Sequence, residues 1–512
     1  MGTFPQEIIE LIVYFADYVT CRRLLTVSRG FQSAVERSSW SGYRHLPNSD
    51  IKVFLALYRG YRVRFLRNII VNLDFPESRD EEKALLECRE ALDDIRTNNE
   101  FLTRQISDLF MAIKTLEERE RPKDLPKVVS LIIETPFQPN TNEQHCDHRR
   151  FHGWRVQLLN HQELPKLSSI RTLVIGEDGR KDAACRDERP LDLRVVADLV
   201  SKLPNLEVLD CQYLHERFPN YALYPVLSHF TRPWEGPWRD SRHAFAKAMT
   251  GDIFPAKLKT AKLHFGSNRD SHLGWHVDQN VTLPNLIEPL SYDPLCSALR
   301  VFSLRLTELD IHIFADSSLF WPSSGESGAA PPHWPYLKRL NVEFQPASPS
   351  GVWYFQGPDG EGRNATAYKV THEHYPSLTE SEADKEWDRN RYDEDGTLLS
   401  VSNSLFRIIP IDEHLEPFLE AFAKALCNMP LLEEACLLTT LMWRPGARIG
   451  CKDDNYATAN WWSVTYAATS AVPCLTWQVI GGWRPSDELR QHFYDVARQN
   501  SRLPLNEKWI DN

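Results

Sequence analysis

The sequence of 512 residues lacks the short motifs that mark the commonest enzyme chemistries. It contains no GxSxG nucleophile elbow, no GxxxxGK[ST] phosphate loop and no GxGxxG dinucleotide fingerprint. Catalytic triads are defined by geometry rather than by sequence order, so these absences alone do not exclude an enzyme. Because no residue can be singled out as nucleophile, base or cofactor ligand, we predict no catalytic residue, no cofactor and a protein that is not an enzyme.

Paired cysteines are also missing, since the ten cysteines form no CxxC pair and follow no regular spacing. The first 15 residues lack the basic start and the small-residue cleavage site of a secretory signal. Both features favour reduced thiols, and we expect a cytoplasmic or nuclear protein.

An excess of positive charge is absent, because the formal net charge is −11. Nucleic-acid backbones select basic surfaces, so a general nucleic-acid binder is not expected. Residues 455–483 contain no charged residue or histidine, but they are rich in Asn, Thr and Ser and include Pro473. A membrane-spanning helix needs about 20 predominantly apolar residues. We therefore predict buried strands here and no membrane partner.

Two groups of histidines have some of the features of metal sites. His145-Cys146-Asp147-His148 is followed by His152, and a second cluster is the tripeptide 372–374, His-Glu-His. A structural zinc site takes four ligands, usually in two spaced pairs, and neither group has a second pair. We predict no metal site, with metal binding at 145–152 left open as the alternative to a polar surface turn.

Residues 4–40 have the pattern of three short helices. Pro5 is suited to a first helical turn, where its missing amide proton is not needed. Ser28 can cap a third helix with its hydroxyl. The apolar stripe of the first helix is Ile8, Ile9, Ile12 and Val13; a second set is Val19, Leu24, Leu25 and Val27; the third comprises Phe31, Ala34, Val35 and Trp40. A unit of this size cannot bury all of these side chains. The remaining apolar side chains therefore pack on the rest of the chain or form a docking face.

These residues resemble an F-box. The segment Phe4-Pro5-x-Glu7-Ile8-x-x-x-Ile12 is similar to the LPxEIxxxI opening of that family, and Val27-Ser28-Arg29-x-Phe31 is similar to its VSRxF centre. The resemblance covers less than a tenth of the chain. It implies docking to a Skp-type adaptor, and through it to a cullin. The docking face that it implies consists of Phe4, Pro5, Ile8, Ile12, Leu24, Leu25 and Val27.

Between this module and the remainder, residues 65–75 alternate like a strand that Pro76 ends, and residues 79–96 and 98–120 are expected to form two helices. One apolar stripe in the second helix favours a core face over a cofactor box. Its members are Phe101, Ile106, Leu109, Phe110, Ile113 and Leu116.

From Leu125 onward a theme of the form P-x-L-x-x-L-x-apolar recurs. Its copies lie at 165–175, 204–211, 258–265, 299–306, 335–342 and 430–437. Amphipathic stretches at 191–203 and 417–429 precede two of them, which predicts helix, tight turn and strand in succession. Long insertions, predicted as loops, are expected at 138–162, 212–250, 266–295, 316–333 and 346–404.

We therefore predict an α+β protein with three parts: an F-box-like helical module at 1–45, a connecting strand and helices at 46–124, and an irregular leucine-rich-repeat-like αβ solenoid at 125–512. This layout resembles that of fungal F-box proteins. The resemblance implies the substrate-recognition subunit of a Skp–cullin–F-box ubiquitin ligase, which binds an unknown protein target. The alternatives are a binding scaffold that engages no ligase and an enzyme of unrecognised type.

Overall fold

The chain is a mixed α/β protein built around one large, mostly parallel sheet, as its computed structural model shows. The structure describes residues 4–37, 43–45, 51–73, 75, 91–119, 129–134, 154–176, 189–212, 214, 234–249, 254–265, 279–326, 330–379, 381–382, 386, 402–448, 458–468, 472–500 and 503–511.

Ten α-helices lie within these residues. They are α1 (Gln6–Phe15), α2 (Tyr18–Leu24), α3 (Arg29–Val35), α4 (Ile51–Leu57), α6 (Leu92–Arg119), α7 (Arg194–Val200), α9 (Glu235–Met249), α10 (Pro294–Ser303), α12 (Asp412–Leu426) and α13 (Asp487–Asn500). Short 3-10 helices are η2 (Gly60–Phe65), η4 (His161–Glu163), η6 (Ser317–Leu319) and η7 (His372–His374).

The large sheet has thirteen strands. They are β1 (Tyr43–His45), β2 (Asn68–Val71), β3 (Val129–Ile133), β4 (Ile170–Ile175), β5 (Val208–Cys211), β6 (Thr260–His264), β8 (Glu308–Ile313), β9 (Arg339–Phe344), β12 (Ser402–Leu405), β14 (Glu434–Arg448), β15 (Thr458–Ala467), β16 (Cys474–Val479) and β17 (Asn506–Asp511). Two small pairs join β7 (Pro284–Asn285) to β11 (Tyr368–Lys369) and β10 (Phe355–Gln356) to β13 (Ile409–Pro410).

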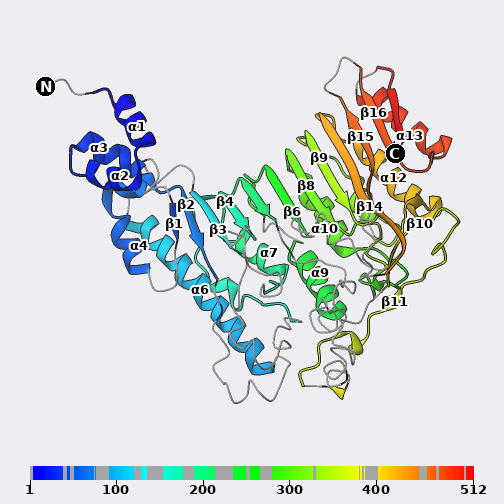
Figure 1. Cartoon of the computed structure of the whole chain (residues 1–512), viewed down its shortest axis with the longest axis horizontal. Coiled ribbons are helices and arrows are strands. Elements are labelled where there is room, and N and C mark those ends of the chain that lie inside the picture. The colour runs from blue at the N-terminus through cyan, green and yellow to red at the C-terminus, as the bar shows by residue number, and fades with distance from the viewer. Residues whose placement is uncertain are drawn as a thin grey trace.

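Strand order follows chain order, and all neighbours from β1 to β14 along the main path are parallel. Parallel neighbours need crossover connections. These contain α6, α7, α9, α10 and α12, while η6 lies between β8 and β9. The sheet ends with the antiparallel strands β15 and β16, then β17 parallel to β16. Figure 1 shows the strands fanning around a bend, with α1–α3 at one upper end and β15 and β16 at the other.

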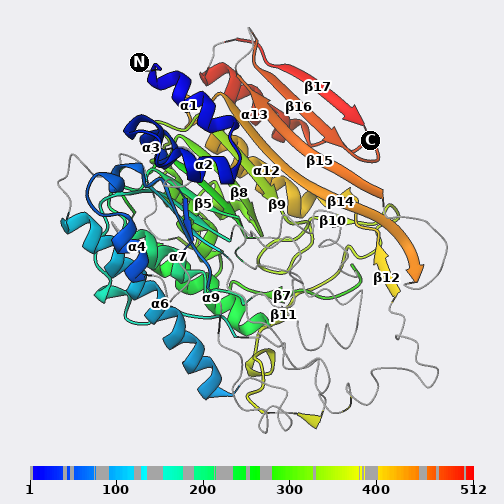
Figure 2. The ribbon, with the colours of Figure 1, turned by 60° about the vertical axis from the view of Figure 1, so that its left-hand side comes forward.

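One face of the sheet carries the core. Alternate strand residues are buried against the helices, as in the buried-intermediate pattern of β3 and β16. Two rows of side chains cross the strands in register, and every member is buried. One row is Ile69, Leu131, Leu173, Leu209, Ala261, Leu309, Leu340 and Ala435; the other is Val71, Ile133, Ile175, Cys211, Leu263, Ile311, Val342 and Leu437. Figure 2 shows α4, α6, α7 and α9 grouped together along one side of the strands.

The amino-terminal helices have a small core of their own. Its buried members are Ile9, Val13, Cys21, Ala34 and Val35, and these residues form a cluster distinct from the main core. A salt bridge of 3.1 Å between Arg62 and Glu36 connects the end of α3 to η2. The module α1–α3 therefore has apolar packing that is separate from that of the sheet.

Several predicted elements have different limits from those expected. Helix α6 is continuous through residue 97, where a break between two helices was expected, and residues 79–90 lie outside the described part. Asn99 on this helix accepts a hydrogen bond from the amide of Gln157 at 2.8 Å, and Thr103 accepts one from the amide of Leu159 at 2.8 Å. The two polar side chains thus bind the backbone of residues 157 and 159, and they do not interrupt helix α6. The predicted strand at 65–75 is shorter, because β2 spans only Asn68–Val71.

Three corrections concern the repeat region. The insertion predicted as a loop at 212–250 contains helix α9, which buries Trp238, Phe245 and Met249 at helical spacing. The copy of the theme expected at 299–306 coincides with the end of α10, and the strand begins later, at Glu308. Helix α12 begins at Asp412, so that Pro417 lies inside it rather than at its start. The buried strands expected within 455–483 are confirmed as β15 and β16.

Among the helices described, none has the length and apolar composition needed to cross a membrane.

A buried ion pair fastens two of the crossover helices. The guanidinium of Arg242 on α9 donates to the carboxylate of Asp293 at 2.6 Å, and both side chains are fully buried. The same carboxylate caps α10 by accepting the amide of Cys296 at 3.0 Å. Close by, burial raises the pKa of Asp316 to about 6, and the charge of Asp293 adds to this shift. The pair thus sets the position of α9 against the first turn of α10.

We predict that Arg242→Met lowers the free energy of unfolding by about 3–5 kcal/mol, because it leaves the carboxylate of Asp293 buried without its cation. Urea denaturation followed by circular dichroism measures this change. The control is Arg498→Met, which removes an exposed pair with Asp495 and should change stability by no more than about 0.5 kcal/mol. Equal effects of the two substitutions would contradict the assignment.

Candidate functional site: the exposed apolar face of the amino-terminal module

Each helix of the module begins at a residue suited to that position. Helix α1 follows Pro5, and Asp17 caps α2 by accepting the amide of Thr20 at 2.7 Å. Hydrogen bonds from the backbone and side chain of Thr20 lower the pKa of the exposed Asp17 carboxyl. Ser28 accepts the amide of Phe31 at 3.3 Å, which confirms the predicted cap of the third helix.

Helix α1 is apolar on both of its faces. Ile9 and Val13 point into the module core, and Ile8 and Ile12, one position earlier in each turn, remain exposed. Because one turn holds 3.6 residues, a single helix can serve the core and still present a second apolar stripe. The exposed large apolar side chains of residues 4–27 are Phe4, Ile8, Leu11, Ile12, Tyr14, Phe15, Val19, Leu25 and Val27.

Most residues predicted for the docking face are exposed in the structure. Phe4, Ile8, Ile12, Leu25 and Val27 are exposed, as is Pro5. Leu24 differs, since it is half-buried and packs against the core of the module. Leu24 is therefore a core residue of the module with part of its side chain at the surface.

Four apolar residues of the exposed set were not part of the predicted docking face, although Val19 was assigned to the second apolar set of the module. They are Leu11, Tyr14, Phe15 and Val19, of which Phe15 keeps 77% of its surface and Tyr14 76%. The signal was present, because the helix sequence QEIIELIVYF is apolar around most of its circumference. A helix of that kind is typical of an element that is covered on more than one side.

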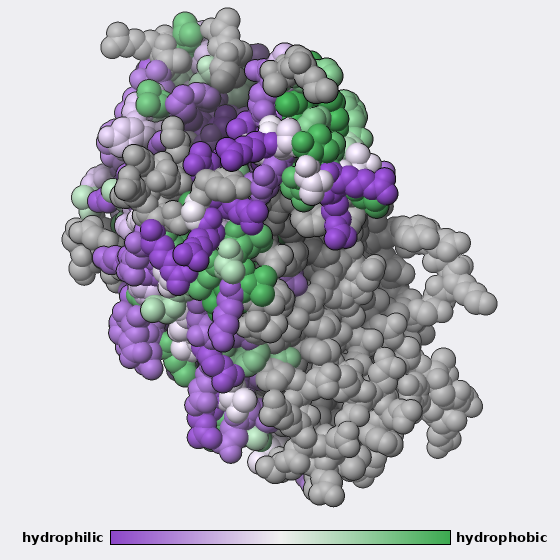
Figure 3. Space-filling view, turned by 90° about the vertical axis from the view of Figure 1, so that its left-hand side faces the viewer, coloured by the Kyte–Doolittle hydropathy of each residue, from purple (hydrophilic) through white to green (hydrophobic). Residues whose placement is uncertain are grey.

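Charged groups border the apolar residues. Arg37 at the end of the module forms an ion pair of 2.6 Å with Glu10 on α1. Helix α2 carries Arg22 and Arg23 in its last turn. Figure 3 views the molecule from the side on which the module lies, and hydrophobic atoms gather in the upper part of that face next to hydrophilic ones.

The described residues elsewhere show little chemistry of the metal-binding kind. They contain no group of three or more His, Cys, Asp or Glu side chains placed to hold a metal ion. The tripeptide His372–His374 forms the 3-10 helix η7 rather than a strand, with His374 stacked on Tyr368 at 5.0 Å between ring centroids. The cluster at residues 145–152 lies outside the described residues.

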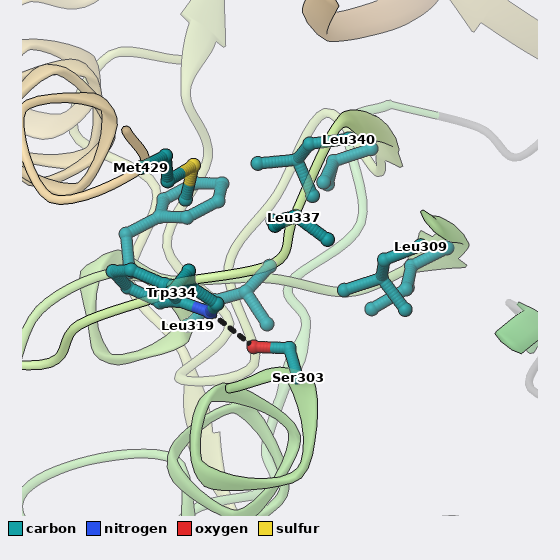
Figure 4. A pocket seen from close by; sticks show the side chains of 10 residues that line it. Ser303, Leu309, Leu319, Trp334, Leu337, Leu340 and Met429 are labelled. Atoms are coloured by element: carbon teal, nitrogen blue, oxygen red, sulfur yellow. Dashed lines mark hydrogen bonds between the residues drawn. The ribbon is translucent and has the colours of Figure 1, made fainter. Parts of the chain in front are cut away.

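The described residues also include two fully buried thiols and a small apolar pocket. Burial raises the pKa of Cys211 and of Cys296 well above the usual value, which keeps both thiols protonated. An apolar cavity of about 10 Å³ lies between α10, β8 and β9, and at its edge Trp334 donates to the hydroxyl of Ser303 at 2.7 Å. Figure 4 shows Leu309, Leu337 and Met429 among the side chains that line it. This volume holds at most one water molecule.

In comparison with known proteins, the chain matches no family model and no curated protein.

The two faces of α1 should respond differently to the same substitution. We predict that Val13→Ser accelerates amide hydrogen exchange throughout α1–α3 by about 30-fold, because a buried methyl pair is replaced by a hydroxyl at a cost of about 2 kcal/mol. Ile12→Ser, one residue away on the exposed face, should change exchange less than about threefold. Since the module has a separate core, the sheet should be unaffected in both variants. Equal loss of protection in the two variants would show that Ile12 belongs to the core.

Proposed function

We propose that the chain is the substrate-recognition adaptor of a Skp–cullin–F-box ubiquitin ligase, acting in the cytoplasm or nucleus. The module α1–α3 docks on a Skp-type adaptor, and through it on a cullin, while the sheet region binds a protein target. No residue of the chain reacts. Ubiquitin transfer is performed by another subunit, and the chain contributes by raising the effective concentration of the target near it.

The observation that carries this proposal is the exposed apolar set on a module that already has its own core. Large exposed apolar patches mark interaction sites in folded proteins. Each large apolar side chain that becomes fully covered contributes about 1.5–3 kcal/mol. The positions that resemble the F-box docking face, among them Phe4, Ile8 and Val27, are on the exposed side, as docking requires. A cap that served only the fold of the chain would bury them against it.

The second part of the proposal is an irregular leucine-rich-repeat-like solenoid as the target-binding platform. Successive strand and helix units add to the same parallel sheet in chain order, which supports it. Long segments outside the large sheet, such as 279–293 and 345–379, connect successive units. Segments of that kind on a rigid scaffold are where recognition residues are commonly found.

The docking face can be tested by co-purification. We predict that Ile8→Glu combined with Leu25→Glu lowers recovery of a tagged Skp-type adaptor about tenfold or more, because binding would bury two unpaired carboxylates. Pull-down with quantitative immunoblotting measures the recovery. Both positions are exposed, so the variant should keep the circular dichroism spectrum of the parent chain.

The matched control is Val301→Glu, which introduces one carboxylate at an exposed apolar position on α10, away from the module. Recovery of the adaptor should be unchanged. If the adaptor does not bind the parent chain, or binds the double variant equally well, the ligase proposal is wrong and a scaffold that engages no ligase is favoured.

A further inference from the structure

The face of the sheet opposite the core carries a row of polar side chains. On adjacent strands β6, β8 and β9 the register places His264, His312 and Glu343 side by side. A second row, two residues earlier on each strand, is Lys262, Asp310 and Asn341 and extends to Asp210 on β5. Towards the amino terminus the same face is apolar, with Ile70 and Ile132 in register. The polar side chains are therefore concentrated on the central strands.

Asp310 is held firmly within these rows. Its carboxylate accepts from the amide of Asn341 at 2.8 Å and lies 3.5 Å from Nε2 of His264. Burial acts to raise the pKa of Asp310, but hydrogen bonds from His264 and Asn341 outweigh it and keep the pKa below its usual value. Asp310 is thus a fixed negative charge in the middle of the face.

Glu343 is in a different state. Burial raises its pKa to about 7, and the charge of Asp310 adds to the shift while His264 opposes it. The nearest imidazole nitrogen, Nε2 of His312, lies 3.6 Å away and also 3.4 Å from the amide nitrogen of Gln345. Burial lowers the pKa of His312 to about 4, so this imidazole is neutral at pH 7. Among the described residues, Glu343 therefore forms no ion pair with a lysine or arginine.

The charges of the central strands leave an excess of carboxylates. Arg339 is occupied by an ion pair with Glu308 on the neighbouring strand. Lys262 is the other cation of these rows and lies opposite both Asp210 and Asp310. One oxygen of Asp210 is buried and has no hydrogen-bond partner. Apart from the Arg339–Glu308 pair, the carboxylates among the described side chains of this face from β5 to the start of β14 are Asp210, Asp310, Glu343 and Glu434, and the cation is Lys262.

We propose that the row formed by His264, Asp310, His312 and Glu343 binds a lysine or arginine side chain of an extended polypeptide segment in the target. This proposal deepens the proposed function, since the segment would mark the ligase target, but the binding itself needs no adaptor.

Charge complementarity selects this occupant. A metal ion is disfavoured, since within the described residues these side chains do not form a group placed to hold one. A small free ligand would need an enclosed site, and the small apolar pocket beside Trp334 lies on the helix side of the sheet, on the face opposite this row. His264 and His312 are buried, whereas Glu343 and Asp310 keep part of their side chains at the surface. A guanidinium or ammonium group carried by a polypeptide can therefore donate to Glu343 while Asp310 adds attraction.

Binding should release a proton. Because the bound cation favours the charged form of Glu343, the proton on this carboxyl is displaced, and affinity rises with pH across its pKa. For a pKa of about 7, affinity should be about tenfold weaker at pH 6 than at pH 8. The other titratable groups facing Glu343 are His312 and Asp310 on β8, His264 on β6 and Cys436 on β14. Protonated histidines at low pH would repel the bound cation, so they too would lower the affinity as the pH falls.

The test uses the full-length chain and a random dodecapeptide library displayed on phage. We expect selection to enrich peptides with one fixed Lys or Arg, and a fluorescein-labelled synthetic copy to bind with the pH dependence above in fluorescence polarisation. Glu343→Gln should weaken that peptide about tenfold at pH 8 and flatten its pH profile. The matched control is Glu308→Gln, whose parent carboxylate is already paired with Arg339, and it should bind like the parent chain.

Enrichment without a basic residue, or equal binding by Glu343→Gln and the parent chain, would overturn the proposal. A pH profile that persists unchanged in Glu343→Gln would assign the proton to a histidine and overturn the role given to Glu343. Adaptor co-purification is measured separately with the module variants, so failure of the ligase proposal and failure of the basic-segment site give different results.

Discussion

Two buried rows of apolar side chains, held in register by the parallel backbone ladder, determine most of what the sheet region presents. Each of the eight strands β2, β3, β4, β5, β6, β8, β9 and β14 contributes one residue to each row, for example Leu173 and Ile175 on β4. Strand side chains alternate between faces, so a slip of one residue would bring the whole apolar set to the opposite side. The same register that buries these rows also aligns His264 with His312 and Glu343. The polar row is thus a consequence of core packing.

The need to bury these two rows determines the residues of the strands and of the helix faces that cover them. It does not determine the length of the connecting segments. The theme recurs at very uneven intervals, yet β6, β8 and β9 pair without a register shift. Between β8 and β9 the described residues contain no α-helix, yet Phe320 of this connection packs on Phe418 and Phe422 of α12. Entropy of loop closure rises only slowly with length, which makes long insertions tolerable.

Local periodicity explains which parts of the fold were predictable. The module helices, the strands β4 to β6 and the strands β15 and β16 have short-range patterns that the sequence displays directly. Helix α9 was missed because its buried surface includes Arg242 and Ser241, polar residues whose partners come from distant segments. Helix α10 was not predicted, and a copy of the repeat theme was expected at 299–306 instead. Its cap, Asp293, is also the partner of Arg242, which lies far away in the sequence. The polar row escaped notice because it exists only after three strands are placed side by side.

Separate cores allow the two proposed surfaces to work independently. The module buries Ile9 and Val13 among its own helices, and the sheet buries its rows against α6 to α12. Covering the exposed stripe of α1 therefore requires no rearrangement of the sheet, and a cation bound at Glu343 requires none of the module. An adaptor that acts by proximity needs this property, because affinity for a target should not depend on whether the ligase is attached. Coupling would instead need a packed element shared by the two cores, and no described residue belongs to both of them.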